Sequence, residues 1–377
     1  MTWSKVPFLQ ALRDASGGNA KVPKTEFRDS GALPIIDQGQ GSIAGYVDDL
    51  DLAQRNPLPV IVFGDHTRCF KFIDFPFAVG ADGVKILAVA DGFDPRYLFW
   101  FLTSLKIPSA GYSRHYKYLK EFSVVKPPLA EQKRIAAVLD QVDTLRAKRR
   151  EAIALLDGLA QSIFVDMFGD PTSPSSPWDR KTIGELGVVV TGNTPSRAKP
   201  ENYGDGIEWI KTDNIKPPEL NPSKAAERLS VAGERVGRVV PAEAILVTCI
   251  AGSPASIGNA ALAGRRVAIN QQINAFIPEG SLPRFMLEQI RVGKGLVQQR
   301  STGGMKGLVN KSQFSSISLL VPPVDRQQEF VHRVQCVDSE RARSVRHLAA
   351  LDELFTSLQH RAFSGTLWDH EVTGGAA

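Results

Sequence analysis

Apolar residues recur with alternating spacings of three and four in two long segments of this 377-residue chain. The spacing places them on one face of a helix and predicts long helices over about residues 131–168 and 322–363. Sustained heptads with charged flanks favour coiled-coil packing. Two copies related by a two-fold axis would run antiparallel, each burying its stripe on the other. In the alternative, each helix packs on its own globular body. One polar position interrupts each stripe, Arg149 in the first and Arg341 in the second. The stripes contain Ile135, Val138, Val142, Leu145, Ala152, Leu156, Leu159 and Ile163, and then Val334, Val337, Val345, Leu348, Leu351, Phe355 and Leu358.

Each predicted helix follows a body of short β-type runs separated by Gly and Asp turns. A Pro-Pro pair closes each body, because neither a strand ladder nor a helix interior accommodates two prolines. The pattern predicts an α+β fold in which two similar mixed α/β bodies are joined by two long antiparallel helices. Strands are expected at 60–63, 84–89, 187–190 and 244–247, and helices after Asp94-Pro95 and around 283–290. The predicted domains are residues 1–125, 126–170, 171–321 and 322–377.

The chain contains the same module twice. Residues 127–168 align with 322–363 without a gap, so that Val142 falls on Val337 and Phe168 on Phe363. Each whole repeat, a body followed by its helix, is far longer than the roughly 20–50 residues of a solenoid unit. A duplicated module can sit about a pseudo-two-fold axis, which suits a target with two half-sites. Upstream the similarity continues with small shifts, placing Trp3 on Trp178, residues 32–36 on 207–211, and residues 77–80 on 267–270.

The net charge of +5 is unevenly distributed. Residues 171–321 have six more positive than negative side chains, whereas residues 1–125 have one more. This fits nucleic-acid contact by the bodies and protein contact by the helices, although many proteins that bind no nucleic acid have a similar excess. The chain has no run of 18 apolar residues and no signal-peptide pattern at Met1, and its three cysteines are scattered. A cytoplasmic, reduced protein without membrane contact is predicted.

The second body contains an ordered series of short motifs. They are WDRKTIGEL at 178–186, TGNTPS at 191–196, IEWIKTDNI at 207–215, AINQQ at 268–272 and STGG at 301–304. This series, repeated around two long helices, resembles the specificity subunit of type I restriction–modification systems. The resemblance covers nearly the whole chain and is strong over residues 178–365. It is weaker over 1–125, where DQGQ at 37–40 replaces TDNI at 212–215.

The resemblance implies a chain that catalyses nothing itself. Each body would be a target-recognition domain for one half of a split double-stranded DNA sequence. The paired helices would set the spacing and dock two methyltransferase subunits, with restriction subunits joining outside them. AdoMet, ATP and Mg are expected on those partners, and no cofactor on this chain. A helix over residues 131–168 would be about 55 Å long, compared with about 34 Å for one turn of DNA.

The sequence lacks the familiar motifs of an enzyme. It has no Gly-x-Gly-x-x-Gly turn after a strand, no Walker phosphate loop and no Asp/Asn-Pro-Pro-Tyr/Phe methylation motif. EWIK at 208–211 resembles a nuclease Glu-x-Lys but has one residue too many. Two alternatives remain open. One is a self-contained DNA-modifying enzyme or nuclease that uses Glu208 or Lys211. The other is a specificity-like chain that serves a different multi-subunit defence complex.

Candidate DNA-binding residues follow from side-chain chemistry. Arg, Lys, Asn and Gln bind base edges, whereas Ser, Thr and backbone amides bind phosphates. In the first body, residues 112–120 alternate basic and aromatic side chains, which suits clamping and stacking, although the tyrosines could instead pack in the core. Each candidate could also be a turn residue without a ligand. The first body offers Gln38, Gln40, Arg68, Lys71, Arg114, Lys117, Tyr118 and Lys120. The second offers Asn193, Thr194, Ser196, Arg197, Lys211, Thr212, Asp213, Asn214, Gln271, Gln272, Ser301, Thr302 and Lys306.

Overall fold

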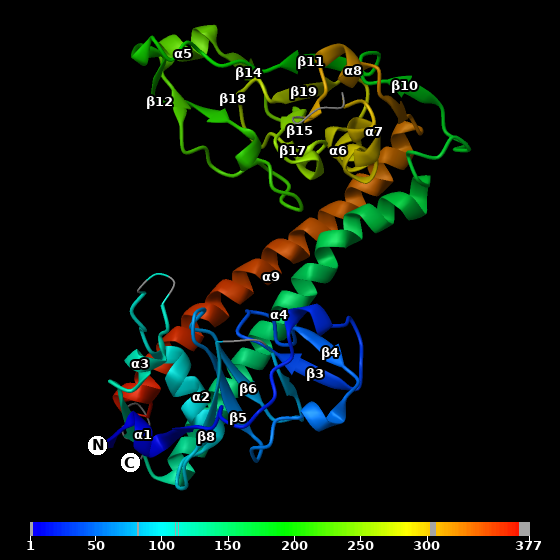
Figure 1. Cartoon of the computed structure of the whole chain (residues 1–377). Coiled ribbons are helices and arrows are strands. Elements are labelled where there is room, and N and C mark those ends of the chain that lie inside the picture. The colour runs from blue at the N-terminus through cyan, green and yellow to red at the C-terminus, as the bar shows by residue number, and fades with distance from the viewer. Residues whose placement is uncertain (1–2, 81–82, 110, 112, 302–306, 369–377) are drawn as a thin grey trace, which may run out of the picture. The chain divides into compact units, whose positions relative to one another are not determined.

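The computed structural model describes residues 3–80, 83–109, 111, 113–301 and 307–368, and the chain divides into two compact units. One unit is Met1–Arg149 with His347–Ala377, and the other is Arg150–Arg346. The two predicted long helices are confirmed as α4 (Leu129–Phe168) and α9 (Val324–Ser364), and each unit contains part of both (Figure 1). The finer division into four domains stays a prediction. No helix in the described part of the chain is both long and apolar enough to span a bilayer.

The first body is strand-rich with short helices. Within its described residues, one sheet has the order β2-β8-β5-β6, a second has the order β4-β3-β7, and β1 pairs with β9. The strands are β1 (Ser4–Pro7), β2 (Leu12–Asp14), β3 (Leu33–Ile36), β4 (Gly45–Val47), β5 (Val60–Gly64), β6 (Phe70–Ile73), β7 (Ala78–Val79), β8 (Val84–Val89) and β9 (Ser123–Lys126). The helices are α1 (Phe8–Ala11), α2 (Pro95–Ser104) and α3 (Tyr116–Leu119), with 3-10 turns η1 (Lys24–Glu26) and η2 (Leu50–Leu52).

The second body has a similar arrangement of sheets with additional elements. Its described sheets are β11-β19-β15-β17 and β13-β12-β18-β14, with the pairs β10-β21 and β16-β20. The strands are β10 (Arg180–Thr182), β11 (Gly187–Thr191), β12 (Tyr203–Ile210), β13 (Arg228–Leu229), β14 (Arg238–Val240), β15 (Ile245–Thr248), β16 (Ile250–Ala251), β17 (Ala260–Leu262), β18 (Val267–Ile269), β19 (Ile273–Pro278), β20 (Gly307–Leu308) and β21 (Ser318–Leu320). The helices are α5 (Val231–Val236), α6 (Pro283–Val292), α7 (Lys294–Gln298) and α8 (Lys311–Ser315), with 3-10 turns η3 (Pro200–Asn202), η4 (Thr212–Asn214) and η5 (Pro254–Ser256).

A fully buried strand lies inside one four-stranded sheet of each body, β5 in β2-β8-β5-β6 and β15 in β11-β19-β15-β17. Successive residues of a strand face opposite sides of the sheet. In β5, Ile61 and Phe63 therefore enter the core shared with α2, while Val60 and Val62 enter a second core. The same alternation occurs in β15. This explains why both strands appear in the sequence as continuous apolar runs and not as alternating ones.

A buried glutamine attaches each body to its long helix in the same way. Gln132 donates from Nε2 to the Pro127 carbonyl at 2.9 Å, and its Oε1 accepts from the Asp94 N–H at 2.8 Å. Gln327 repeats both bonds. Its Nε2 donates to the Pro322 carbonyl at 2.9 Å, and its Oε1 accepts from the Leu282 N–H, just ahead of α6, at 3.1 Å. The duplication seen in the sequence is thus conserved in hydrogen bonds that fix α2 and α6 to the long helices.

The predicted antiparallel pairing of α4 and α9 is present within each unit (Figure 1). In the first unit, Arg146 Nε of α4 donates to Asp352 of α9 at 2.6 Å. In the second unit, Arg341 Nε of α9 donates to Asp157 of α4 at 2.5 Å. The repeat aligns Arg146 with Arg341 and Asp157 with Asp352. The two ion pairs are therefore the same pair formed twice, as expected for an antiparallel duplication.

The helices also pack on the bodies, so the two expected arrangements occur together. In the second unit, rings from α4, α6 and α9 form one aromatic cluster with centroid separations of 5.1 to 5.9 Å. All four rings are buried. A helix pair that shares its core with a globular body is more firmly placed than one that packs only on its partner helix. The cluster consists of Phe164, Phe168, Phe285 and Phe330.

The predicted apolar stripes are partly wrong. Leu145, Leu159 and Val345 were assigned to the helix interface, but they are 47%, 40% and 42% exposed. The seam includes Arg146 in α4 and Arg341 in α9, which are polar and only partly exposed. A pattern that follows apolar residues alone chose Leu145 in place of the neighbouring Arg146, and Val345 in place of the buried Ser344. The least exposed face, which includes contacts with the bodies, runs through 132, 135, 139, 142, 146, 149, 153, 156, 160, 163 and 167 in α4, and 327, 330, 334, 337, 341, 344, 348, 351, 355, 358 and 362 in α9.

Candidate nucleic-acid interface

Parallel strand pairs place the main candidate loops at equivalent positions in the two bodies. Ile36 ends β3 beside β7, and Ile210 ends β12 beside β18 in the same register. The loops that follow are therefore 37–40 and 211–214. The predicted alignment, which placed residue 36 on residue 211, is wrong by one position. Backbone pairing decides this register, and the two sequences are too dissimilar here to reveal it.

The first residue of each loop has the opposite charge in the two bodies. In the first body, the Asp37 carbonyl accepts a hydrogen bond from Lys71 Nζ at 2.9 Å, and its carboxylate lies 3.4 Å from the same nitrogen. Lys71 is 9% exposed, so this candidate supports the loop from inside. In the second body, Lys211 pairs instead with Glu227 at 2.5 Å. The same position therefore presents different chemistry in each body.

Glu227 joins two predicted cations of the second body. Arg197 Nη2 donates to its carboxylate at 3.0 Å, and Lys211 contacts the same group. The hydrogen bonds from Arg197 and then Lys211 outweigh the opposing effect of burial and lower the pKa of Glu227 to about 2. The Arg197 guanidinium also lies 4.3 Å above the Tyr203 ring, and the Lys211 ammonium lies 4.7 Å above the Trp209 ring. The cluster holds two cations in fixed positions, and the Arg197 side chain is still 57% exposed.

The 193–197 loop combines a structural residue with surface residues. Asn193 Nδ2 donates to the Val236 carbonyl at 2.8 Å, and its Oδ1 accepts from the Arg238 N–H at 2.8 Å. Both amide atoms thus hold the turn between α5 and β14. The Thr194 hydroxyl donates to the side-chain carbonyl of Gln271, and both residues are exposed, as is Ser196.

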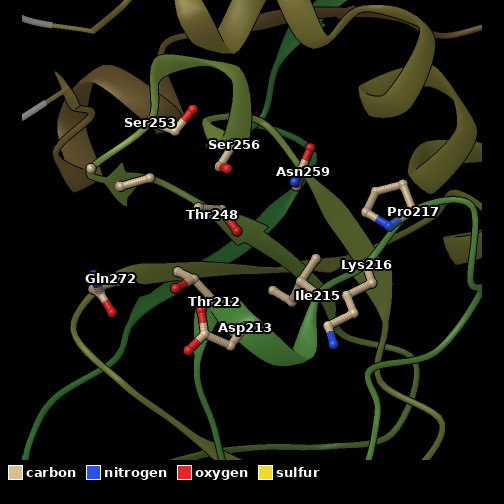
Figure 2. Close-up of a pocket in the computed structure, with 12 residues that line it drawn as sticks. Thr212, Asp213, Ile215, Lys216, Pro217, Thr248, Ser253, Ser256, Asn259 and Gln272 are labelled. Atoms are coloured by element: carbon tan, nitrogen blue, oxygen red, sulfur yellow. The ribbon is translucent and has the colours of Figure 1, made fainter. Parts of the chain in front are cut away.

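A cavity of about 850 Å³ opens beside η4 and contains three predicted candidates, Thr212, Asp213 and Gln272 (Figure 2). Thr248 lies between these residues and the serines opposite. It is 1% exposed, and its Oγ1 has no hydrogen-bond partner among the described residues. A buried hydroxyl without a partner is rare, so it marks a place where a polar ligand or ordered water would bind. The lining residues that the sequence did not indicate are Ile215, Lys216, Pro217, Thr248, Ala251, Gly252, Ser253, Ser256 and Asn259.

The lining offers both hydrogen-bond donors and acceptors. It contains hydroxyls, two amides, the Asp213 carboxylate and the Lys216 ammonium. Mixed donors and acceptors suit a nucleobase edge, whereas a cluster of arginines and lysines would suit a phosphate. The Gly252-Ser253-Pro254 turn beside this cavity is a sequence signal for a loop, and it could have directed attention there.

The strand end equivalent to Thr248 in the first body is crowded by Gln38 and Thr67. Gly64 ends β5 in its ladder with β8, as Thr248 ends β15 in its ladder with β19. A Cβ atom on Gly64 would collide with the Thr67 hydroxyl and lie 2.8 Å from the Gln38 carbonyl oxygen. Thr67 donates to that same carbonyl at 2.5 Å. The two bodies therefore present different surfaces on one framework.

Most of the other first-body candidates are basic and exposed. Arg114, Lys117 and Lys120 are exposed, whereas Tyr118 is half-buried with the Lys117 ammonium 4.9 Å above its ring. Tyr116 packs in the core, as one alternative expected for these tyrosines, and burial is the main cause that raises its pKa to about 12. The remaining candidates are Gln40, which is exposed, and Arg68, which is exposed and donates to the Ile107 carbonyl at 3.3 Å.

Four candidates near the second body's loops remain. Asn214 is a structural residue, because its Oδ1 accepts from the Lys211 N–H at 3.0 Å and its Nδ2 donates to the Lys224 carbonyl at 3.2 Å. Ser301 is half-buried beside α7. Thr302 and Lys306 lie outside the described residues. The Asn214 side chain thus holds its own loop.

The nuclease-like EWIK segment is committed to internal ion pairs. The Glu208 carboxylate pairs with Arg265 and accepts from the Ala225 N–H at 3.0 Å. The Arg265 hydrogen bond is the main cause that lowers the pKa of Glu208. Lys211 pairs with Glu227, as described above. Among the described residues, no group of three or more His, Cys, Asp or Glu side chains could hold a metal ion.

These features define a protein class: a duplicated α+β framework with two dissimilar polar surfaces and no recognisable catalytic constellation among its described residues. The family model of the type I restriction modification DNA specificity domain matches residues 12–155 and 175–346, which together are most of the chain. The chain belongs to this family, that of the specificity subunits of type I restriction–modification systems.

Individual relatives agree with this assignment. The type I restriction enzyme EcoR124I/EcoR124II specificity subunit of Escherichia coli is 23% identical over 335 residues, covering 84% of this chain and 82% of that protein. The HindI specificity subunit of Haemophilus influenzae is 30% identical over 151 residues, covering 38% and 32%. The fold resembles the type I system S subunit from M. genitalium, with a TM-score of 0.58, 14% identity and 96% of both chains covered. A chain from a structure on type I system assembly and conformational transition has a TM-score of 0.58 and 16% identity, with 97% and 98% covered.

Proposed function

We propose that this chain recognises DNA without catalysing a reaction, each body contacting one half of a bipartite double-stranded sequence. The observation that carries the proposal is one framework with two different polar surfaces. Gln132 and Gln327 attach the bodies identically, yet the end of β15 borders a cavity where the end of β5 is filled by Gln38 and Thr67. A duplicated scaffold whose variable parts lie in equivalent loops suits two half-sites of unlike sequence.

The helix pair is proposed to set the spacing between the half-sites. α4 contains 40 residues, and at 1.5 Å per residue it is about 60 Å long. One turn of DNA measures about 34 Å. Interlocking ion pairs and a shared aromatic core would make the pair stiff enough to define a distance.

The helices are also proposed to dock two methyltransferase subunits, with restriction subunits joining outside them. Supporting this, apolar side chains remain exposed on α4 and α9, among them Leu155 at 72%, Leu354 at 46% and Leu145 at 47%. Exposed apolar side chains along helices are typical of protein-binding surfaces. AdoMet, ATP and Mg would bind to those partners and not to this chain, and the complex would act on DNA in the cytoplasm.

The test is sequencing of methylated DNA from cells that contain the methyltransferase partner with and without this chain. A bipartite methylated motif that disappears with the chain supports the proposal. Normal methylation in its absence refutes it. Turnover of DNA by the purified chain alone, abolished by Glu208→Gln, would instead establish a self-contained enzyme. Co-purification with a different defence complex would assign the same recognition role to another assembly.

A further inference from the structure

Arg341, the polar residue that interrupts the second stripe, bonds in two directions. Its Nε donates to Asp157 of α4 at 2.5 Å. Its Nη2 and Nη1 face the Glu219 carboxylate at 2.8 and 3.4 Å. Glu219 belongs to the loop that follows η4 in the second body. One guanidinium therefore joins both long helices to a loop of the second body. Because two of its nitrogens face the same carboxylate, the contact fixes the orientation of Glu219 as well as its distance from Arg341. We refer to this Arg341–Glu219 contact as the loop arm and to the Arg341–Asp157 contact as the helix arm.

This loop forms one wall of the 850 Å³ cavity. Thr212, Asp213, Ile215, Lys216 and Pro217 all line it. At its far end the loop is held by α6. The Arg291 guanidinium donates to the backbone carbonyls of Pro218 at 3.3 Å and Glu219 at 2.6 Å. The loop is therefore held at two places. Its backbone carbonyls bond to Arg291 of α6, and the Glu219 carboxylate bonds to Arg341 of α9.

The first unit has the same ion pair across the helices, but its arginine makes a different second contact. Arg146, the equivalent of Arg341, bonds to Asp352 across the helix pair and to Asp143 on its own helix at 2.8 Å. Its guanidinium also lies 4.4 Å above the Phe355 ring. Each of these contacts stays within α4 and α9. The arm to a recognition loop is therefore a specific feature of the second unit.

We infer that Arg341 is a positioning residue for sequence discrimination: it holds the 212–219 loop in register with the helix pair, so the second body's cavity keeps the shape that selects its half-site. The inference rests on the proposed function. Glu219 is 58% exposed, and exposed ion pairs contribute little to stability. Loss of this arm should therefore alter the loop's position more than the folding of the body. Any change in the helix pair on partner binding would reach the cavity through the same arm.

The experiment uses the complete complex with its methyltransferase partner. Its methylated motif is determined first, and single-base substitutions are then made in each half-site. Thr248→Val, in the cavity itself, identifies the half-site that the second body contacts. Glu219→Gln removes the charge of the loop arm, and Asp157→Asn weakens the helix arm. We expect both to lower discrimination at that half-site by about 2- to 30-fold, with Glu219→Asp restoring part of it. Discrimination at the other half-site and the melting temperature should stay unchanged.

Asp352→Asn is the matched control, because it weakens the equivalent ion pair that has no loop arm. It should leave discrimination at the second body's half-site unchanged. The inference is overturned if Glu219→Gln has no effect, affects both half-sites equally or acts no more strongly than Asp352→Asn. If the unmodified complex does not methylate a bipartite motif at all, the proposed function fails instead, and the two failures are distinguishable.

Discussion

Replacing Gln327 with alanine would remove two hydrogen bonds at the junction of the second body and its long helix. The side chain donates to the Pro322 carbonyl at 2.9 Å and accepts from the Leu282 N–H at 3.1 Å, and it is 1% exposed. Both backbone groups would lose their partner in a site from which water is largely excluded. Each unpaired group costs about 1 to 3 kcal/mol. We therefore expect the free energy of unfolding to fall by about 2 to 4 kcal/mol, the upper bound being reduced by water that reaches the Leu282 amide.

The assay is urea unfolding of the full chain, combined with hydrogen exchange at the first amides of α6. The neighbouring Gln328 is exposed on the same helix and provides the control, because Gln328→Ala should change stability by less than about 0.5 kcal/mol. Gln132→Ala should produce a similar loss with faster exchange at the start of α2. Equal effects of Gln327→Ala and Gln328→Ala would refute the reasoning, as would a loss without any change in exchange at α6.

Three further predictions concern the candidate interface. Thr248→Val removes a buried hydroxyl that lacks a partner, so it should raise the stability of the free chain by about 1 kcal/mol while weakening DNA binding by the complex; a loss of stability in calorimetry would argue against an unpaired hydroxyl. The pKa of Glu227 is about 2 when folded, below its ordinary value of 4.5, so its contribution to stability is present above 4.5 and is lost as pH falls toward 2. Glu227→Gln should therefore lower the melting temperature at neutral pH and have no effect near pH 2, and a constant difference at all pH values would exclude this cause. Lys117→Ala should lower the salt dependence of DNA affinity by about one phosphate contact and weaken binding equally for all sequences. Fluorescence titration at several salt concentrations would measure this, and a change in sequence preference would show base contact instead.

The stripes illustrate how far periodicity reaches. Spacing predicted both long helices, because a face of apolar residues must be buried wherever it forms, and the duplication predicted their antiparallel pairing. Part of the buried face was misplaced, with Leu145 chosen in place of Arg146. Arg146 and Arg341 lie in the seam because each finds a carboxylate on the opposite helix, Asp352 and Asp157 respectively. Those partners are about 200 residues away in the chain, and no local pattern reveals them.

The candidate interface shows the same limit. Thr212, Asp213 and Gln272 were found because polar residues in Gly- and Asn-rich loops are typical of binding sites. Thr248 was missed because it ends an apolar strand and looks like a core residue. Asn193 was chosen for its amide, which in the fold bonds to backbone on both sides. Whether a polar residue supports a loop or meets a ligand depends on which groups lie opposite it.

The sequence by itself determined the duplication, the two long helices, the α+β class and the family, because these depend on composition, period and motif order along the chain. Only the tertiary structure decided the seam, the register of the 211–214 loop, the cavity and its closed counterpart at Gly64, and the arm from Arg341 to Glu219. Each of these arises between residues far apart in the chain, and the geometry and burial that select such contacts do not exist until the strands and helices have packed.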